Sequence, residues 1–194
     1  MSIFNDSDAK KIYKLTSNWI TSNSIGEIQY ISVVKDYEKK LWNHVNEKIR
    51  YSNNTSEINR FKNEVVYSGE LFRIHRITDN QRKFVYPSGY HQHWCKDLKS
   101  ISNIQSFGYG LLIIGNTNQG ISPLNLINYL KENNNNIPNG NFSRYENENE
   151  IAAPLGKKNI SKMYKIQLNE LENYKISGIE IEPSNWFKKT RSFY

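Results

Sequence analysis

Hydrophobic residues in the first third of the chain recur with the spacing of a helix face. In residues 11–19 and again in 31–49, apolar side chains return every three or four positions. The polar run 52–55 interrupts this pattern, and Thr55 or Ser56 could cap a short helix that reaches Lys62. Residues 1–63 are therefore predicted to form a helical part.

The second part of the chain, from Glu64 onward, has the short apolar runs that are typical of strands. We expect strands in segments 65–67, 70–75, 90–95, 110–115, 151–155, 161–168 and 176–181. Two helices are expected between them, at 97–107 and at 124–130, where Ser122-Pro123 suits a first helical turn. Helices followed by strands predict an α+β fold, with both parts in one compact domain.

Composition limits the class of protein without indicating its function. A length of 194 residues suits one domain, and 13% aromatic residues indicate a packed interior. Lys and Arg exceed Asp and Glu by 26 to 19, but they are scattered and give no specific signal for nucleic acid as a partner. The single cysteine, Cys95, cannot form an internal disulfide. The polar start and the short apolar runs favour a soluble, cytoplasmic protein that does not bind a membrane.

The most informative segment carries three carboxylates at a spacing of two, Glu146, Glu148 and Glu150. In an extended segment these side chains would share one face. Like charges at that distance repel, so a folded protein needs a reason to hold them together. The spacing alone favours an exposed, solvated loop, and the neighbouring residues are needed to decide between that loop and a functional site.

Glu148-Asn149-Glu150, followed by the apolar segment 151–156, resembles the Glu-x-Glu motif of the arginine-type ADP-ribosyltransferases. Upstream, Leu71-Phe72-Arg73 resembles the arginine motif of that family's first strand. The segment 94–98, ahead of the expected helix, resembles the second motif, Ser-x-Ser, and Gly120-Ile121-Ser122 is similar to the family's approach to the catalytic strand. The resemblance covers residues 64–168. It departs from the family pattern at Ile74, where glycine is usual, and at His93 and Cys95, where serines are expected.

The resemblance implies two small packed β-sheets that follow the helices and form a cleft for NAD, which is the substrate. Glu150 would stabilise the positive charge that develops on the ribose, and Glu148 would orient or deprotonate the nucleophile, commonly an arginine guanidinium. Arg73 would hold the NAD phosphates, with Arg76 as the alternative in a shifted register. The further residues expected to bind NAD are Phe72, His93 and Cys95.

The implied activity is that of a mono-ADP-ribosyltransferase, which releases nicotinamide and modifies an acceptor protein, with residues 64–194 as its catalytic core. Phe142 and Tyr145 would either touch the target protein or pack in the interior. This chemistry requires no metal. Length and motif order are similar to those of small bacteriophage transferases, which suggests an effector that acts on host proteins in the host cytoplasm. A toxin is the other origin considered.

Other readings of the same residues stay open at the level of sequence. His91, His93 and Cys95 would share one strand face and could bind zinc, although no fourth ligand is evident. His93 and Cys95 could also form a nucleophile pair. The chain could be a non-enzymatic basic binding or inhibitor protein on a degenerate transferase fold. It could also be an NAD glycohydrolase, in which water replaces the acceptor.

Overall fold

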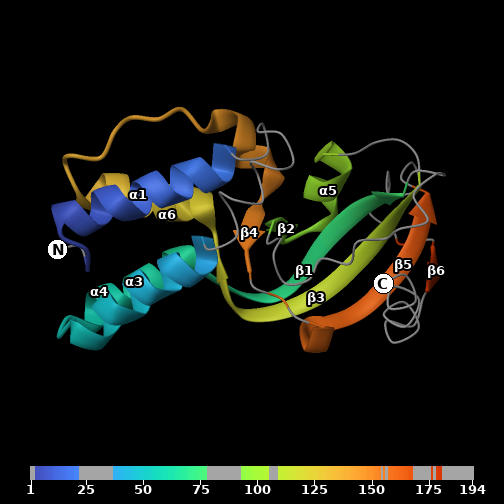
Figure 1. The fold of residues 1–194 in the computed structure, drawn as a ribbon, viewed down its shortest axis with the longest axis horizontal. Helices are drawn as coiled ribbons and strands as arrows, with labels where there is room; N and C mark the ends of the chain where they lie inside the picture. Colours follow the sequence, from blue (N-terminus) through green and yellow to red (C-terminus); the bar gives the residue numbers. More distant parts are fainter. Residues whose placement is uncertain are drawn as a thin grey trace, which may run out of the picture.

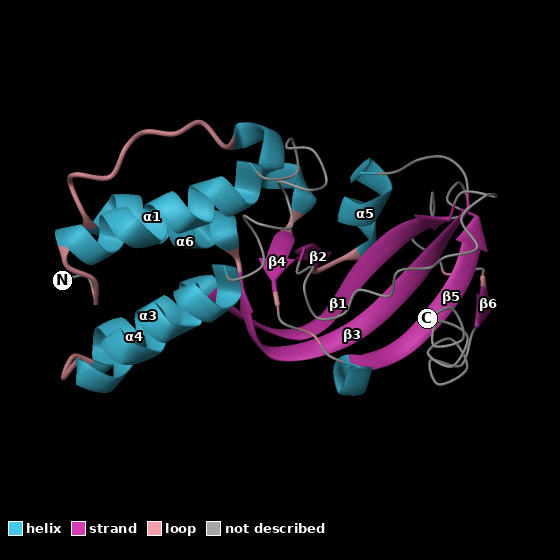
Figure 2. Ribbon diagram, viewed as in Figure 1, coloured by secondary structure: helices cyan, strands magenta, loops and turns pink. Residues whose placement is uncertain are grey.

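The structure is a computed structural model that describes residues 3–21, 37–77, 93–104, 109–153, 155, 157–167, 176 and 178–180. Figures 1 and 2 show most of its helices gathered at one end of the molecule and a curved antiparallel sheet at the other. The expected α+β class is confirmed.

The predicted helices are present, with ends shifted by a few residues. They are α1 (Asp6–Thr21), α3 (Tyr37–Tyr51), α4 (Thr55–Val65), α5 (Leu98–Ile104) and α6 (Pro123–Asn133), and the described residues also include the 3-10 helices η2 (Ser143–Glu148) and η3 (Lys157–Asn159). The expected helical residues 31–36 and 105–107 lie outside the described residues. No helix in the described ranges is long and apolar enough to cross a membrane.

Side-chain caps explain where two of these helices begin. α6 begins at Pro123 as expected, and Ser122 caps it, since its side chain accepts a hydrogen bond from the backbone N–H of Asn125. The cap of α4 is Asn54 rather than Thr55 or Ser56. Asn54 Oδ1 accepts the backbone N–H of Glu57 at 3.0 Å, so the helix begins one residue after it.

The described strands also follow the predicted pattern, but two of them are longer than expected. They are β1 (Val66–Ile77), β2 (His93–Cys95), β3 (Tyr109–Ile121), β4 (Glu150–Ala152), β5 (Ile160–Gln167) and β6 (Ile179–Glu180). β1 joins two segments that we expected as separate strands, and the pairing is irregular between Tyr67 and Gly69, where Gly69 has a φ of +149°. Segment 90–92, predicted to continue β2, lies outside the described residues.

These strands form one antiparallel sheet in the order β1-β2-β4-β3-β5-β6, and β1 also pairs with β3. The short strands β2 and β4 pair with each other. They reach the long strands through the pairs Phe72↔Cys95 and Ile121↔Ala152, so β1, β2, β4 and β3 close a ring. The described strands therefore form one sheet rather than the two small packed sheets that we expected. The reason is that β1 and β3 are long enough to curve around the short pair (Figure 1).

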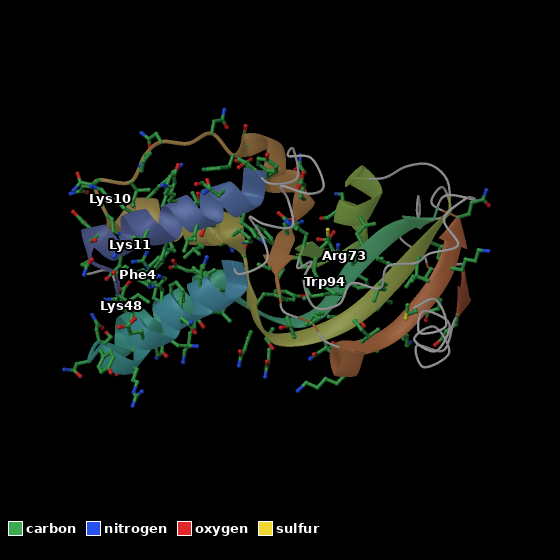
Figure 3. All side chains as sticks on the ribbon, viewed as in Figure 1. Phe4, Lys10, Lys11, Lys48, Arg73 and Trp94 are labelled. Atoms are coloured by element: carbon green, nitrogen blue, oxygen red, sulfur yellow. The ribbon has the colours of Figure 1, made fainter. Side chains whose placement is uncertain are left out.

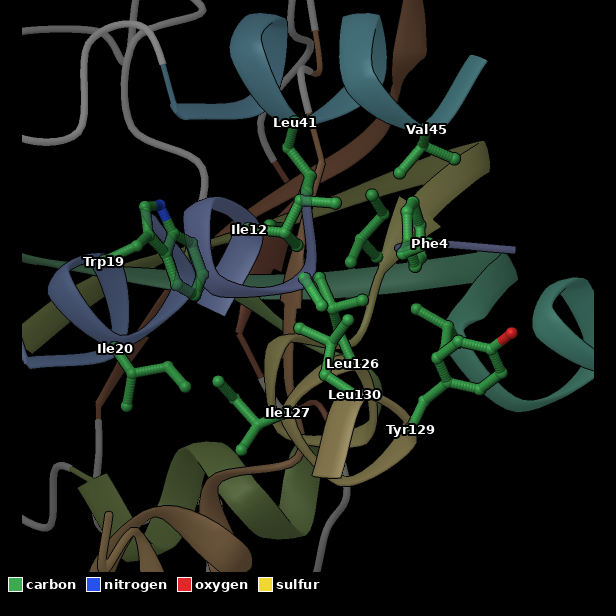
Figure 4. Packing of buried hydrophobic residues seen from close by; sticks show 14 of the residues in the cluster. Phe4, Ile12, Trp19, Ile20, Leu41, Val45, Leu126, Ile127, Tyr129 and Leu130 are labelled. Carbon is green, nitrogen blue, oxygen red and sulfur yellow. The ribbon is translucent and has the colours of Figure 1, made fainter. Parts of the chain in front are cut away.

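The largest hydrophobic cluster lies between the helices and includes residues from both halves of the chain. α6 packs against α1 and α4, so the N-terminal helices bury their apolar faces with the help of a helix from the second half. Figure 4 shows the centre of this helical core, which includes Phe4, Ile12, Trp19, Ile20, Leu41, Val45, Leu126, Ile127, Tyr129 and Leu130. At its edge an ion pair joins α3 to α1, with Lys48 Nζ 2.6 Å from Asp8 Oδ2.

A buried carboxylate inside the helical core has a hydrogen-bond donor and a cation beside it. The Tyr129 hydroxyl donates to Glu57 Oε1 at 2.6 Å, and both residues are buried. The guanidinium of Arg60 lies 3.7 Å from the same oxygen and over the Tyr129 ring. A carboxylate away from water is unfavourable unless it is hydrogen-bonded, so these contacts allow Glu57 to stay inside.

We expect Tyr129→Phe to lower the free energy of unfolding by about 1–3 kcal/mol, because Glu57 would lose its hydroxyl donor while staying buried. Urea denaturation followed by circular dichroism measures the change. Tyr51→Phe is the matched control, because Tyr51 is 72% exposed and loss of its hydroxyl should change stability by no more than about 0.5 kcal/mol. Equal stabilities of the two variants would contradict the role of this hydrogen bond.

Candidate active site

Three segments that are far apart in the sequence meet where β2 lies between β1 and β4. Phe72 of β1 pairs with Cys95 of β2, and Cys95 pairs with Glu150 of β4. The three residues thus form one row across adjacent strands. These strands carry the three motifs on which the transferase resemblance rests, and the fold brings the motifs together although they span about eighty positions of the sequence.

Glu150 is bonded to the neighbouring strand by its side chain. His93 Nδ1 is the hydrogen-bond and ion-pair partner of Glu150 Oε1, and the side chains are only 11% and 10% exposed. The two residues are diagonal neighbours on one face of the β2–β4 pair, since Cys95 faces Glu150 and Ala152 faces His93. On the other side of His93, the indole of Trp19 from α1 stacks on the imidazole, with ring centroids 3.8 Å apart and an interplanar angle of 11°.

A pocket of about 220 Å³ opens beside Glu150, at the junction of the helices and the sheet. Its charged and phenolic lining residues are Glu64, Tyr67, Lys96, Tyr145, Glu146 and Glu150. Three carboxylates and one ammonium group suit a cationic ligand group better than an anionic one. Pockets that enclose drug-sized ligands measure about 300–1,000 Å³. This pocket could therefore enclose one ring of a dinucleotide but not the whole molecule.

The segment that carries the three carboxylates is not extended, so the condition under which they would share one face is not met. Glu146 and Glu148 lie in the 3-10 helix η2, and only Glu150 lies in a strand. Between them Asn149 adopts a left-handed conformation, with φ 45° and ψ 42°. This conformation ends the alternation of side chains, so the three carboxylates do not share one strand face. Glu146 and Glu150 line the pocket, whereas Glu148 is not among its lining residues.

Contacts with the start of α5 hold Asn149 in this conformation. Its side-chain amide donates to Asp97 Oδ2 and to Ser100 Oγ, both at 3.0 Å, and its carbonyl accepts the backbone N–H of Lys96. Asp97 uses its other carboxylate oxygen to accept the N–H of Ser100, which caps α5. Asp97, which was predicted to lie at the start of this helix, therefore caps the helix and also supports the turn before Glu150.

We expect Asn149→Gly to lower the free energy of unfolding by about 1–2 kcal/mol, because two side-chain hydrogen bonds are lost while glycine accepts the left-handed backbone. Asn149→Ala should cost about 1 kcal/mol more, since alanine loses the same bonds and adds strain at a positive φ. Thermal and urea denaturation measure both values. Alanine and glycine variants of equal stability would show that the turn is not left-handed.

Cys95, a predicted NAD-contacting residue, is buried at 7% exposure beneath α5. Burial raises the pKa of its thiol, and the negative charges of Glu150, Asp97 and Glu148 raise it further, while the positive charge of Arg73 acts in the opposite sense. The residue is thus a protonated thiol at neutral pH. This state opposes the nucleophile-pair hypothesis and also opposes thiolate binding of zinc, because both chemistries need the thiolate.

Arg73 lies on β1 opposite Ile113 of β3 and is half-buried. Because side chains alternate along a strand, Arg73 points to the opposite face of β1 from Phe72, and it does not line the pocket. Figure 3 shows Arg73 and Trp94 in the region where β1, β2 and α5 come together. A dinucleotide with one ring in the pocket would have to extend along β1 and β2 to reach Arg73. The backbone of Arg76, the alternative, is in β1, but the structure does not describe its side chain.

The two aromatic residues expected to touch a target protein or to pack inside are both in the helical core. Phe142 is 9% exposed, packs edge-on against Tyr13 and lies beneath the ammonium group of Lys131. Tyr145 is 8% exposed and forms one wall of the pocket. Phe142 therefore has the packing role in this structure, whereas Tyr145 could still contact a group that enters the pocket.

The metal-site hypothesis gains no support from the described residues. Within them, no cluster of three or more His, Cys, Asp or Glu side chains could hold a metal ion. His91, one of the three suggested ligands, lies outside the described part of the chain. Of the other two, His93 turns Nδ1 toward Glu150 and Cys95 is buried as a thiol.

Sequence reasoning missed several residues that the fold brings to the site. Glu64 and Lys96 line the pocket, and Trp19 stacks on His93. Glu146 was recognised as part of the acidic segment, but it was given no role of its own. The spacing of the three carboxylates does not distinguish Glu146 from Glu148, because the turn at Asn149 depends on contacts elsewhere in the chain. The Trp19 contact joins positions 74 residues apart, and no local pattern reports on such a pair.

We expect Cys95 to resist alkylation by iodoacetamide at pH 8 in the folded protein and to react once the chain is unfolded, because burial keeps the thiol protonated. The unfolded chain releases this proton first as the pH rises. The stability advantage of the wild type over Cys95→Ala should therefore shrink above about pH 8.5. Mass spectrometry follows alkylation at this single cysteine, and rapid labelling of the native protein would show that the thiol is accessible and acidic.

Comparison of the chain with protein-family models, with curated proteins and with solved structures gives no match. The motif residues and the geometry that surrounds Glu150 are therefore the features that bear on function.

Proposed function

We propose that this chain is a mono-ADP-ribosyltransferase that uses NAD as its substrate and Glu150 as its catalytic carboxylate. The observation that carries the proposal is the row of Phe72, Cys95 and Glu150 across three adjacent strands, because it joins the three segments that resemble the family motifs. Two properties of Glu150 support it further. The carboxylate lines a pocket whose charged groups are mostly acidic, and a neighbouring histidine orients it.

The chemistry asks for a fixed negative charge beside the ribose. When the bond between nicotinamide and C1′ of the ribose breaks, its electron pair leaves with the nicotinamide and positive charge develops on the ribose. A carboxylate held in a largely enclosed site stabilises that charge without first having to reorganise. Glu150 meets this requirement, since His93 holds it and it is only 10% exposed. The acceptor nitrogen then bonds to C1′ and loses a proton.

A second carboxylate would hold the acceptor and receive that proton. The resemblance assigns this role to Glu148, whereas the pocket lining favours Glu146. A carboxylate suits an arginine guanidinium in both charge and geometry. We therefore propose arginine as the acceptor side chain of the target protein.

NAD hydrolysis is a second candidate, and one observation favours it. Glu148 lies before the left-handed turn at Asn149 and does not line the pocket. If Glu148 rather than Glu146 is the acceptor carboxylate, the pocket lacks it. Water could then take the place of the arginine, and the products would be ADP-ribose and nicotinamide.

We expect Glu150→Gln to lower nicotinamide release at least about 100-fold, because the charge that stabilises the ribose cation is lost. Release is measured with the purified protein and NAD, and transfer is measured with labelled NAD on arginine-containing proteins of a bacterial lysate. Glu146→Gln and Glu148→Gln, assayed in parallel, identify the acceptor carboxylate, since its loss should reduce transfer more than hydrolysis. Glu47→Gln, which removes an exposed carboxylate on α3, is the matched control.

Each outcome distinguishes the candidates. Release that depends on Glu150 together with labelled lysate proteins supports transfer, and release without labelling supports the glycohydrolase. A wild type that releases no nicotinamide, and whose melting temperature NAD does not raise, would refute both enzymes. The non-enzymatic binding protein would then be the remaining hypothesis.

A further inference from the structure

A tryptophan from the N-terminal helical part reaches into the candidate site. Trp19 lies on α1, is fully buried in the helical core, and stacks on His93 of β2 with ring centroids 3.8 Å apart. The interplanar angle of 11° makes the stack nearly parallel, so the indole covers one face of the imidazole. Trp19 of the helical part therefore contacts the face of the His93 ring, and Glu150 of the sheet contacts its edge.

The two contacts on His93 constrain different degrees of freedom. The contact with Glu150 is made at Nδ1, which must carry a hydrogen in order to donate to a carboxylate. An edge contact alone leaves the ring free to turn, because the outer torsion of a histidine side chain has broad minima. The stacked indole removes that freedom. With the ring plane defined, the Nδ1–H points in one direction, and the carboxylate of Glu150 has one preferred position.

The position of Glu150 depends on this donor because the carboxylate is almost fully enclosed. At 10% exposure, a carboxylate that loses its partner is poorly solvated where it stands, and it gains by turning toward the pocket and its water. A shift of that kind would separate the negative charge from the place where the ribose cation forms.

We infer that Trp19 is a positioning residue for Glu150, which acts by fixing the imidazole plane of His93. The expected effect of Trp19 on the reaction rate rests on the proposed function of Glu150. Its expected effect on the His93 ring and on the position of the Glu150 carboxylate does not. The inference gives the helical part a role in the reaction, since α1 completes the support of the carboxylate that β4 carries.

The structural arm of the test uses NMR of the histidine rings without NAD. The chain has four histidines, so comparison with His93→Gln assigns the resonance of His93. In the wild type the ring protons of His93 should be shifted upfield by the indole, and Nδ1 should carry the hydrogen. Trp19→Phe should keep a smaller upfield shift and the same tautomer. Trp19→Leu should lose the shift and give a mixture of tautomers. If Trp19→Leu does not fold, Trp19→Met replaces it.

The kinetic arm measures nicotinamide release by the same variants. Trp19→Leu should lower kcat by roughly 10- to 100-fold and leave the KM for NAD within about threefold, because the carboxylate is displaced while the binding surface stays. Trp19→Phe should rescue most of kcat. Phe61→Leu is the matched control, since it removes another fully buried ring from the same helical core, one that packs against Phe4 and Tyr129. It should lower stability but keep kcat per folded molecule.

A double variant tests the route through His93. If Trp19 acts by way of the imidazole, Trp19→Leu should lower kcat no further once His93→Gln is present. If Trp19→Leu lowers kcat just as much when His93→Gln is present, the inference is overturned. An equal loss of kcat in Phe61→Leu would also overturn it. If the wild type releases no nicotinamide, the proposed function fails and the NMR arm decides alone. An unchanged His93 tautomer in Trp19→Leu would then refute the positioning role.

Discussion

The pairing of β2 with β4 is the contact on which the rest of this structure depends. It consists of three residue pairs, yet it closes a ring with the two long strands, which also pair directly with each other. It also places the opposite faces of the pair in different surroundings. Trp94 and Ile151 point into the interior formed with the long strands. His93 and Glu150 share the other face, where α1 contributes Trp19. A shift of one residue in this register would exchange the two faces and dismantle the candidate site.

The helices and the sheet are therefore interdependent. α6, which follows β3 in the chain, completes the core of the N-terminal helices, and α1 reaches back to the sheet through Trp19. The pocket beside Glu150 lies at this junction and takes its lining from α1, α4, the start of β1, the residue after β2, the start of α6, and β4 with the segment before it. Because several elements contribute to it, the relative placement of helices and sheet determines which charges meet there.

The functional proposal draws on two independent features of the molecule. Motif residues that resemble those of the ADP-ribosyltransferases lie on adjacent strands. An oriented carboxylate that is 10% exposed lines a pocket whose charged groups are mostly acidic. The arrangement differs from the expectation in two respects. Arg73 faces away from the row formed by the other motif residues, and the turn at Asn149 separates Glu148 from Glu150. Both differences bear on where the phosphates and the acceptor would lie.

The sequence by itself determined the class of fold, the approximate positions of the described helices and strands, the helix start at Ser122-Pro123 and a strand in the segment 151–155, because periodicity and helix-start signals are local properties. It could not predict the left-handed turn at Asn149, which depends on contacts with Asp97 and Ser100 about fifty residues away. Only the tertiary structure decided the ring of strands, the presence of Glu146 in the pocket and the stacking of Trp19 on His93. Each of these needs distant segments to pack together, and such non-local contacts leave no period in the sequence.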